Sequence, residues 1–322
     1  GFTLRGWHTA PSGKPLIHFL HGNGFCGRTY EPMLQYLAHD FDLWLCDIQG
    51  HGDSDHGGRF VGWNRNAELA IEAFKAHGQP LFGHVPHFGL GHSLGGVLTG
   101  LAMGEHRKLF QRAVLLDPVL FSPAMMLGAA VAILTGTARL SPLARSARSR
   151  RHHWASRDEA FEQLRHRGVY KTWTPEALHA FVRHALKDAP DGGVELKCQP
   201  SREAEVFASA PERLWTLLGR IETPTLVVHA DHTFPFVLEG AARLRRVNRH
   251  VQTQEVSGTH CFMQEQPADS AARVADFLQE RGILGTSILW FERWAGGVLK
   301  PPEEWRGDVL ASVSVHDLPP TA

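Results

Sequence analysis

The sequence predicts an α/β fold with a mostly parallel central sheet, helices on both faces and an inserted helical cap. Short apolar runs alternate with helical patterns through the first 120 residues, which is the order expected when helices connect parallel strands. The alternation stops at about residue 121 and returns near residue 224. The 322 residues therefore predict one α/β domain with an insertion, rather than two domains joined end to end.

Turn residues bound each apolar run of the first part, as they bound strands. The segments between the runs carry apolar side chains at helical spacing, so that Met33, Leu34 and Leu37 share one side of a helix. These patterns predict strands over residues 2–9, 15–20, 41–46, 87–91 and 112–116, and helices over residues 31–39, 67–77 and 94–104. A ligand is expected outside the carboxyl ends of such strands.

The α/β pattern returns after the insertion. It predicts strands over residues 224–229 and 251–256 and helices over residues 239–247 and 268–280. The predicted domains are therefore a discontinuous core of residues 1–120 and 208–284, an inserted helical cap of residues 121–207, and a C-terminal extension of residues 285–322 to which we assign no role.

The composition indicates which partners, cellular compartment and cofactors to expect. Basic and acidic residues balance at 33 each, so no net field attracts the protein to nucleic acid. The four cysteines form no C-x-x-C pair, which favours a reducing compartment, the cytoplasm. The chain begins with Gly1 rather than Met, as a trimmed N-terminus would. No histidine, cysteine and carboxylate set has metal-ligand spacing, so neither a metal nor a cofactor is expected, and the oligomeric state stays open.

The longest apolar stretch covers residues 119–138. Ser122, Pro123 and Gly128 interrupt it, which argues against a membrane-spanning helix. We expect this stretch to pack in the core or to form the inner wall of the cap, in which case the substrate is apolar. A basic cluster follows, either a solvated helix face or a contact for an anionic substrate or head group. Its members are Arg145, Arg148, Arg150, Arg151, His152 and His153.

Gly91-His92-Ser93-Leu94-Gly95 matches G-x-S-x-G between a predicted strand and a predicted helix. In that setting the glycines permit a tight turn that exposes the serine hydroxyl at a helix N-terminus. An oxyanion hole needs one amide from the residue after the serine and one from a loop after an earlier strand. We assign these amides to Leu94 and to Asn23, with Gly24 as the alternative to Asn23, because His21-Gly22-Asn23-Gly24 follows the strand over residues 15–20.

These motifs, with Asp47-Ile-Gln-Gly-His-Gly-Asp-Ser54 and Asp117-Pro118, resemble those of the α/β-hydrolase superfamily over about residues 1–283. In that family the Gly-His-Gly turn is structural, and the triad follows in the order serine, acid, histidine. The resemblance implies Ser93 as nucleophile, His260 as base and Asp231 as the acid that orients the imidazole. Asp117 is the alternative acid, because some members of the family place it after that earlier strand.

The resemblance implies a serine hydrolase, esterase-like or lipase-like, that cleaves a carboxylic ester of a small to medium apolar substrate through an acyl-enzyme. Two other readings stay open. A ligand-binding protein on the same fold would bind saturably without turnover. A membrane-associated lipase or phospholipase would use the apolar stretch and the basic cluster.

Overall fold

The computed structural model describes every residue except 191, 280–284, 289–308 and 313–322. Gly1–Leu278 form one compact unit and Gln279–Ala322 form a second. In the second unit, β11 (Gly285–Ile288) pairs in parallel with β12 (Val309–Ser312). The remainder of the predicted extension lies outside the described residues.

The first unit is built on a seven-stranded sheet in the order β1-β3-β2-β4-β5-β9-β10. Its edge strand β1 is antiparallel to β3, and every other pair is parallel, so the predicted fold class is confirmed. The strands are β1 (Arg5–His8), β2 (Leu16–Leu20), β3 (Asp42–Asp47), β4 (His87–His92), β5 (Arg112–Leu116), β9 (Thr225–His232) and β10 (Val251–Thr259).

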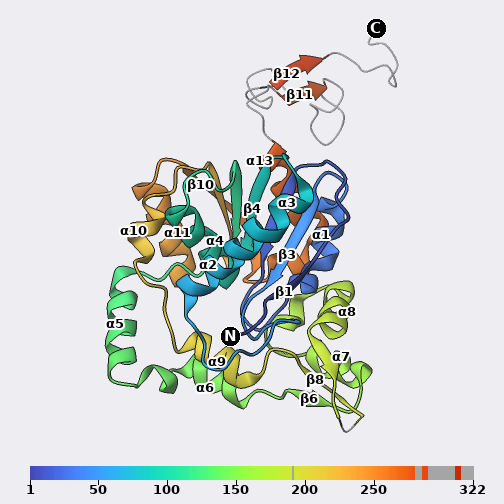
Figure 1. The fold of residues 1–322 in the computed structure, drawn as a ribbon, viewed down its shortest axis with the longest axis vertical. Coiled ribbons are helices and arrows are strands. Elements are labelled where there is room, and N and C mark those ends of the chain that lie inside the picture. The colour runs from blue at the N-terminus through green and yellow to red at the C-terminus, as the bar shows by residue number, and fades with distance from the viewer. Residues whose placement is uncertain (191, 280–284, 289–308, 313–322) are drawn as a thin grey trace, which may run out of the picture. The chain divides into compact units, whose positions relative to one another are not determined.

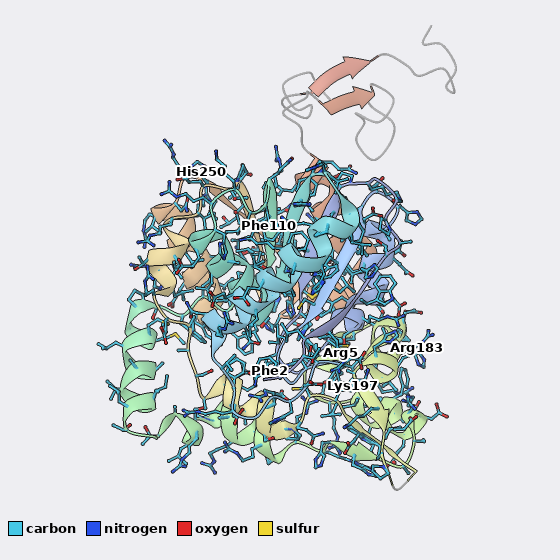
Figure 2. The ribbon with its side chains drawn as sticks, in the orientation of Figure 1. Phe2, Arg5, Phe110, Arg183, Lys197 and His250 are labelled. Carbon is cyan, nitrogen blue, oxygen red and sulfur yellow. The ribbon has the colours of Figure 1, made fainter. Side chains whose placement is uncertain are left out.

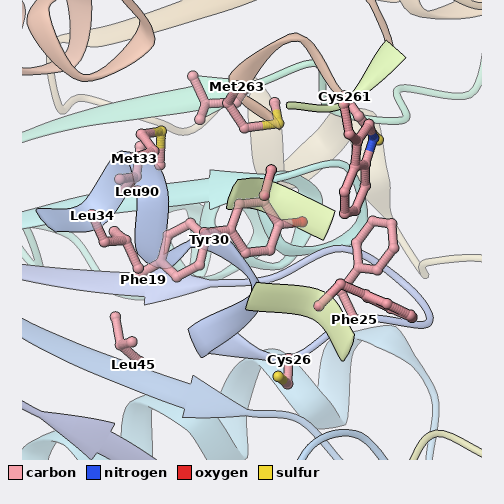
Figure 3. Close-up of a cluster of buried hydrophobic side chains, with 14 of the residues drawn as sticks. Phe19, Phe25, Cys26, Tyr30, Met33, Leu34, Leu45, Leu90, Cys261 and Met263 are labelled. Atoms are coloured by element: carbon pink, nitrogen blue, oxygen red, sulfur yellow. The ribbon is translucent and has the colours of Figure 1, made fainter. Parts of the chain in front are cut away.

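Successive side chains of the buried strands point to opposite faces of the sheet and pack into two separate cores, one on each face. In β2, Ile17 and Phe19 face one core and Leu16 and Leu20 face the other. Figure 3 shows part of the first core, where Phe19 packs among Tyr30, Met33 and Leu34. Helices close both faces, as Figure 1 shows. The first core takes α1 (Glu31–Leu37), α8 (Pro175–His184), α12 (Phe262–Glu265) and α13 (Pro267–Gln279), and the second takes α2 (Trp63–Ala73), α4 (Leu94–Glu105), α10 (Leu214–Leu218) and α11 (Pro235–Val247).

The inserted segment contains strands that the sequence did not predict. It includes a three-stranded antiparallel sheet in the order β6-β8-β7, with two or three residues in each strand, too few to show an alternating pattern. Its strands are β6 (His153–Trp154), β7 (Leu186–Asp188) and β8 (Val194–Leu196), and its α-helices are α5 (Pro123–Leu134), α6 (Pro142–Ser149), α7 (Arg157–Leu164), α8 (Pro175–His184) and α9 (Pro200–Phe207).

An ion pair and a hydrogen bond connect the insertion to segments beside the sheet. Lys197, labelled in Figure 2, lies 2.6 Å from a carboxylate oxygen of Asp53 in the loop after β3. His184 at the end of α8 lies 2.6 Å from Glu31 at the start of α1. The inserted segment therefore contacts the chain that follows the carboxyl ends of β2 and β3, the edge of the sheet where a ligand was expected.

Most of the apolar stretch of residues 119–138 lies outside the core and forms no continuous inner wall, although Leu120 is buried in the second core and Met126 packs against it. Its main element is α5, in which no residue is buried, so the expectation that Met125, Leu127 and Ile133 pack internally was wrong. Only residues just before the helix, such as Val119 and Phe121, contact the cavity described below. In the part of the chain that the structure describes, no helix is long and apolar enough to cross a membrane.

Candidate active site

Ser93 lies in the turn between β4 and α4 with φ 53° and ψ −116°. A positive φ costs a residue other than glycine about 1–3 kcal/mol and persists only where the surroundings enforce it. Here the amide N–H of Ser93 donates to the carbonyl oxygen of Leu116 at 2.9 Å, which attaches the turn to the neighbouring strand β5. The hydroxyl is thereby presented at the first turn of α4.

The glycines around Ser93 are required by close backbone contacts. A Cβ on Gly91 would lie 2.3 Å from the carbonyl oxygen of Gly95, and a Cβ on Gly95 would lie 2.1 Å from that of Leu20. Gly96 faces Pro118, with a Cβ only 3.0 Å from the ring. The G-x-S-x-G-G sequence is therefore what permits β4, α4 and the end of β2 to approach one another.

His260 follows β10 and contacts the serine. Its Nε2 lies 2.9 Å from Ser93 Oγ, and its Nδ1 lies 2.6 Å from Asp117 Oδ2. A carboxylate only accepts hydrogen bonds, so Nδ1 carries the proton and Nε2 is left to accept the Ser93 hydroxyl proton. The ring of Phe234 packs edge-on against the imidazole at a centroid distance of 5.1 Å.

Asp117, at the end of β5, is held by several donors. Its side chain is fully buried, Oδ1 accepts the amide of Ala230 at 2.9 Å, and Oδ2 accepts the hydroxyl of Thr233 as well as the imidazole. Its φ is 43°, again in the left-handed region. These contacts fix the carboxylate in one orientation toward His260.

The structure corrects the expectation for Asp231. Strand β9 continues through His232, so Ala230 points inward and Asp231 points outward. Its carboxylate accepts the amide of Gly258 at 2.9 Å and contacts the adjacent His232, and these bonds lower its pKa. The sequence predicts a strand that ends at residue 229 with the acid in the loop after it, but only two residues separate β9 from α11, and Asp117 makes the contact with His260 instead.

The residues predicted to form the oxyanion hole line the same cavity as Ser93 and His260. Leu94 is the first residue of α4, where an amide has no acceptor within the helix. The side chain of Asn23 is fixed on both sides, because Nδ2 donates to the carbonyl of Glu203 at 3.2 Å and Oδ1 lies 3.1 Å from His51 Nε2. Their role as donors to an oxyanion stays a prediction.

A buried chain of hydrogen bonds that the sequence did not suggest connects the loop before Asn23 to His260. His92 Nε2 lies 2.9 Å from the carbonyl oxygen of His260, so it must donate, and Nδ1 then accepts the hydroxyl of Tyr30 at 2.6 Å. The Tyr30 oxygen accepts the amide of Gly22 at 3.0 Å. Burial lowers the pKa of His92 well below its usual value, which keeps this ring neutral. His92, inside the G-x-S-x-G motif, thus positions the loop of the base.

Tyr30→Phe is expected to interrupt this chain. The Gly22 amide and His92 Nδ1 lose their buried partner, which should lower the free energy of unfolding by about 1–2 kcal/mol and kcat by about tenfold. Urea unfolding and steady-state kinetics measure the two effects. Tyr36→Phe is the matched control, because Tyr36 is exposed. Equal unfolding free energy and equal kcat in Tyr30→Phe and the wild type would show that the chain does not position the site.

A cavity of about 610 Å³ opens beside Ser93 and His260. Its volume falls within the range of small-molecule sites. Its walls are mostly apolar and come from both the core and the insertion. They include Phe25, Trp63, Val119, Phe121, Trp154, Leu164 and Val206.

The basic cluster separates into two groups in the structure. Arg150 lines the cavity, where its guanidinium donates to Glu203 at 2.6 Å and to the hydroxyl of Tyr170 at 2.9 Å. Arg151 also lines the cavity and pairs with Glu159 at 2.8 Å. Arg145 and Arg148 are exposed on α6. The expected solvated face is thus formed by only part of the cluster. Among the residues that the structure describes, no group of three or more histidine, cysteine or acidic residues could hold a metal ion.

Comparisons with known proteins give one family and several partial relatives. The profile of the alpha/beta hydrolase family matches residues 19–274. The type I acyl-CoA thioesterase mpaH of Penicillium roqueforti is 26% identical over 202 residues, which are 57% of this chain and 43% of that protein. The 4-alpha-glucanotransferase of Mycobacterium tuberculosis is 55% identical over 53 residues, 15% of this chain and only 7% of that protein.

The solved structures resemble the chain over most of its length. The peroxisomal α/β-hydrolase Lpx1 of Saccharomyces cerevisiae superposes with a TM-score of 0.67 at 17% identity, covering 84% of this chain and 78% of that one. At this identity the likeness concerns the fold alone. The chain spans less than half the length of the two curated relatives named above, so their activities do not transfer with the match.

Proposed function

The chain belongs to the alpha/beta hydrolase family, and from that premise we propose that it is a serine hydrolase that cleaves a carboxylic ester or a related acyl bond through an acyl-enzyme. The observation that carries the proposal is the hydrogen-bonded series from Ser93 Oγ through His260 to the buried carboxylate of Asp117. Serine, histidine and carboxylate in this geometry are the requirements for activating a hydroxyl as a nucleophile.

The first half of the reaction follows from the protonation states argued above. Ser93 Oγ attacks the substrate carbonyl carbon while His260 Nε2 takes the hydroxyl proton, and Asp117 stabilises the imidazolium that forms. The carbonyl oxygen becomes an oxyanion at the N-terminus of α4, where the amides of Leu94 and Asn23 donate to it. Collapse of the tetrahedral intermediate expels the alcohol, which receives the proton from His260.

The second half uses water as the nucleophile. His260 takes a proton from water, the hydroxide adds to the acyl carbon, and a second tetrahedral intermediate forms in the same oxyanion hole. Its collapse releases the carboxylic acid and returns the proton to Ser93 Oγ. The apolar walls of the cavity favour an apolar acyl group. Because mpaH is named an acyl-CoA thioesterase, thioesters belong in the substrate tests.

Labelling with a fluorophosphonate, read as intact mass, tests the proposal. The wild type is expected to gain one adduct and Ser93→Ala none. Ser146→Ala is the matched control, because Ser146 lines the same cavity but lies outside the turn between β4 and α4, and it should label like the wild type. A chain-length series of p-nitrophenyl esters and the corresponding thioesters then measures the acyl preference.

Folded protein that forms no adduct and turns over neither esters nor thioesters would contradict the proposal. The fold would then serve as a ligand-binding protein, and saturable binding of apolar carboxylic esters without turnover would be the expected observation. An adduct that persists in Ser93→Ala would move the nucleophile to another residue.

A further inference from the structure

Helix α5 exposes an almost entirely apolar surface. Its twelve residues, Pro123–Leu134, contain no charged side chain, and none of them is buried. The exposed fraction reaches 69% at Leu127, 53% at Val131 and 87% at Leu134. Figure 1 shows the helix at the outer edge of the molecule, apart from the helices that cover the sheet. Contiguous exposed apolar surface of this kind marks a binding surface.

The length of α5 restricts what can cover it. Twelve helical residues extend about 18 Å, whereas the hydrocarbon core of a bilayer is about 30 Å thick. A helix of this length and composition is either internal to a protein or lies in a membrane interface. Since no residue of α5 is buried, the interfacial position is the one that satisfies its composition.

The charges around α5 have a single sign. Residues 118–157 contain no aspartate, glutamate or lysine, but six arginines, although the whole chain is balanced at 33 basic and 33 acidic residues. Three of these arginines, Arg139 after α5 and Arg145 and Arg148 in α6, are exposed and form no ion pair with a residue that the structure describes. Apolar side chains flanked by unpaired arginines match the two layers of an anionic lipid surface, acyl chains below and phosphate groups above.

The same segment opens onto the cavity beside Ser93. Val119 and Phe121, just before α5, line the cavity, and so do Leu143 and Ala147 of α6. Arg145 lies between those two positions and is exposed, so α6 presents its apolar residues to the cavity and its arginine to solvent. We propose that α5 and the arginines after it dock the protein on an anionic lipid surface, from which an apolar substrate enters the cavity.

Vesicle binding tests this docking without relying on the proposed hydrolysis, because the Ser93→Ala variant of the full chain is used. Co-sedimentation with phosphatidylcholine vesicles containing one third phosphatidylglycerol is expected to be at least about tenfold stronger than with phosphatidylcholine alone, and to weaken with salt. Leu127→Asp together with Val131→Asp should reduce binding at least about tenfold. Arg145→Glu together with Arg148→Glu should remove the preference for anionic vesicles.

The control is Leu81→Asp, because Leu81 is 44% exposed on α3 (Gln79–Phe82), outside the cap, and should bind vesicles like the parent. Absence of binding to anionic vesicles would overturn the docking. So would a dimer in sedimentation analysis that Leu127→Asp dissociates, since a second copy would then cover α5. In the catalytically intact chain, the α5 variants should lose activity only toward esters carried in vesicles, not toward soluble short-chain esters. Equal loss on both would likewise overturn the route through α5.

Discussion

Asp117→Asn is expected to lower kcat by about 10⁴-fold while leaving the fold intact. The carboxylate of Asp117 is fully buried and faces Nδ1 of His260 at 2.6 Å. An asparagine of the same size presents an amide that can donate to Nδ1, which moves the imidazole proton to Nε2. His260 then has no lone pair for the Ser93 hydroxyl, and the imidazolium has no counter-charge.

The matched variant is Asp231→Asn, which should keep kcat within a factor of about three of the wild type. Asp231 is exposed, and an amide oxygen at the same position can still accept the amide of Gly258. Steady-state kinetics on the best p-nitrophenyl ester compares the two variants, and circular dichroism with thermal unfolding checks that both are folded. If Asp231→Asn lost activity and Asp117→Asn retained it, the acid would be Asp231. The contact between His260 and Asp117 would then contribute nothing to kcat.

The sequence could predict that Ser93 and His260 form one site, because local features mark both residues. Two glycines that permit close backbone contact flank Ser93, and His260 follows the last strand of the sheet. The acid has no such mark. Both Asp117 and Asp231 lie at or near strand ends, and the choice depends on how far β9 continues, which sets the direction of each side chain. Strand ends are the least predictable part of a strand.

Contacts between segments that are distant in the chain could not be predicted from the sequence either. Tyr30 and His92 are 62 residues apart and meet because Tyr30, just before α1, packs in the first core, the core to which Leu90 of β4 also belongs. The exposure of α5 was missed for a different reason. An apolar helix in isolation predicts burial, and only the packing of the inserted segment shows that no residue of this one is buried. The role of α5 is therefore expected in binding something outside this chain, such as the proposed lipid surface, rather than in packing the core.

The free energy of unfolding is expected to fall in mild acid, and His18 is one cause. This residue is fully buried in β2, with its ring packed against Phe74 and Phe110 at centroid distances of 5.0 and 5.7 Å. Burial lowers its pKa from 6.5 to about 4. The unfolded chain therefore binds a proton on His18 over the pH range from 6.5 to 4, while the folded chain does not. The free energy of unfolding must fall as the pH falls through that range.

Other buried groups act in both directions, so the effect of His18 has to be isolated. Burial also lowers the pKa values of His51 and His92, which destabilises the fold in acid in the same way. Burial raises the pKa values of Asp47 and Glu203, so the folded state takes up protons there and gains stability as the pH falls. A comparison of the wild type with a single His18 variant cancels these shared contributions.

His18→Leu is the informative variant, because leucine keeps an apolar side chain of similar size against the two phenylalanines. Relative to the wild type, its free energy of unfolding is expected to increase by about 2 kcal/mol between pH 7 and pH 5, as a shift in pKa from 6.5 to about 4 requires. Urea unfolding at a series of pH values measures the difference, and His77→Gln, at an exposed position, should show none. A His18→Leu difference that stayed constant over this range would mean that His18 is solvated or already protonated in the folded state. In that case β2, which leads to the loop that contains Asn23, would be more open to water at His18 than the full burial of Ile17 and Phe19 indicates.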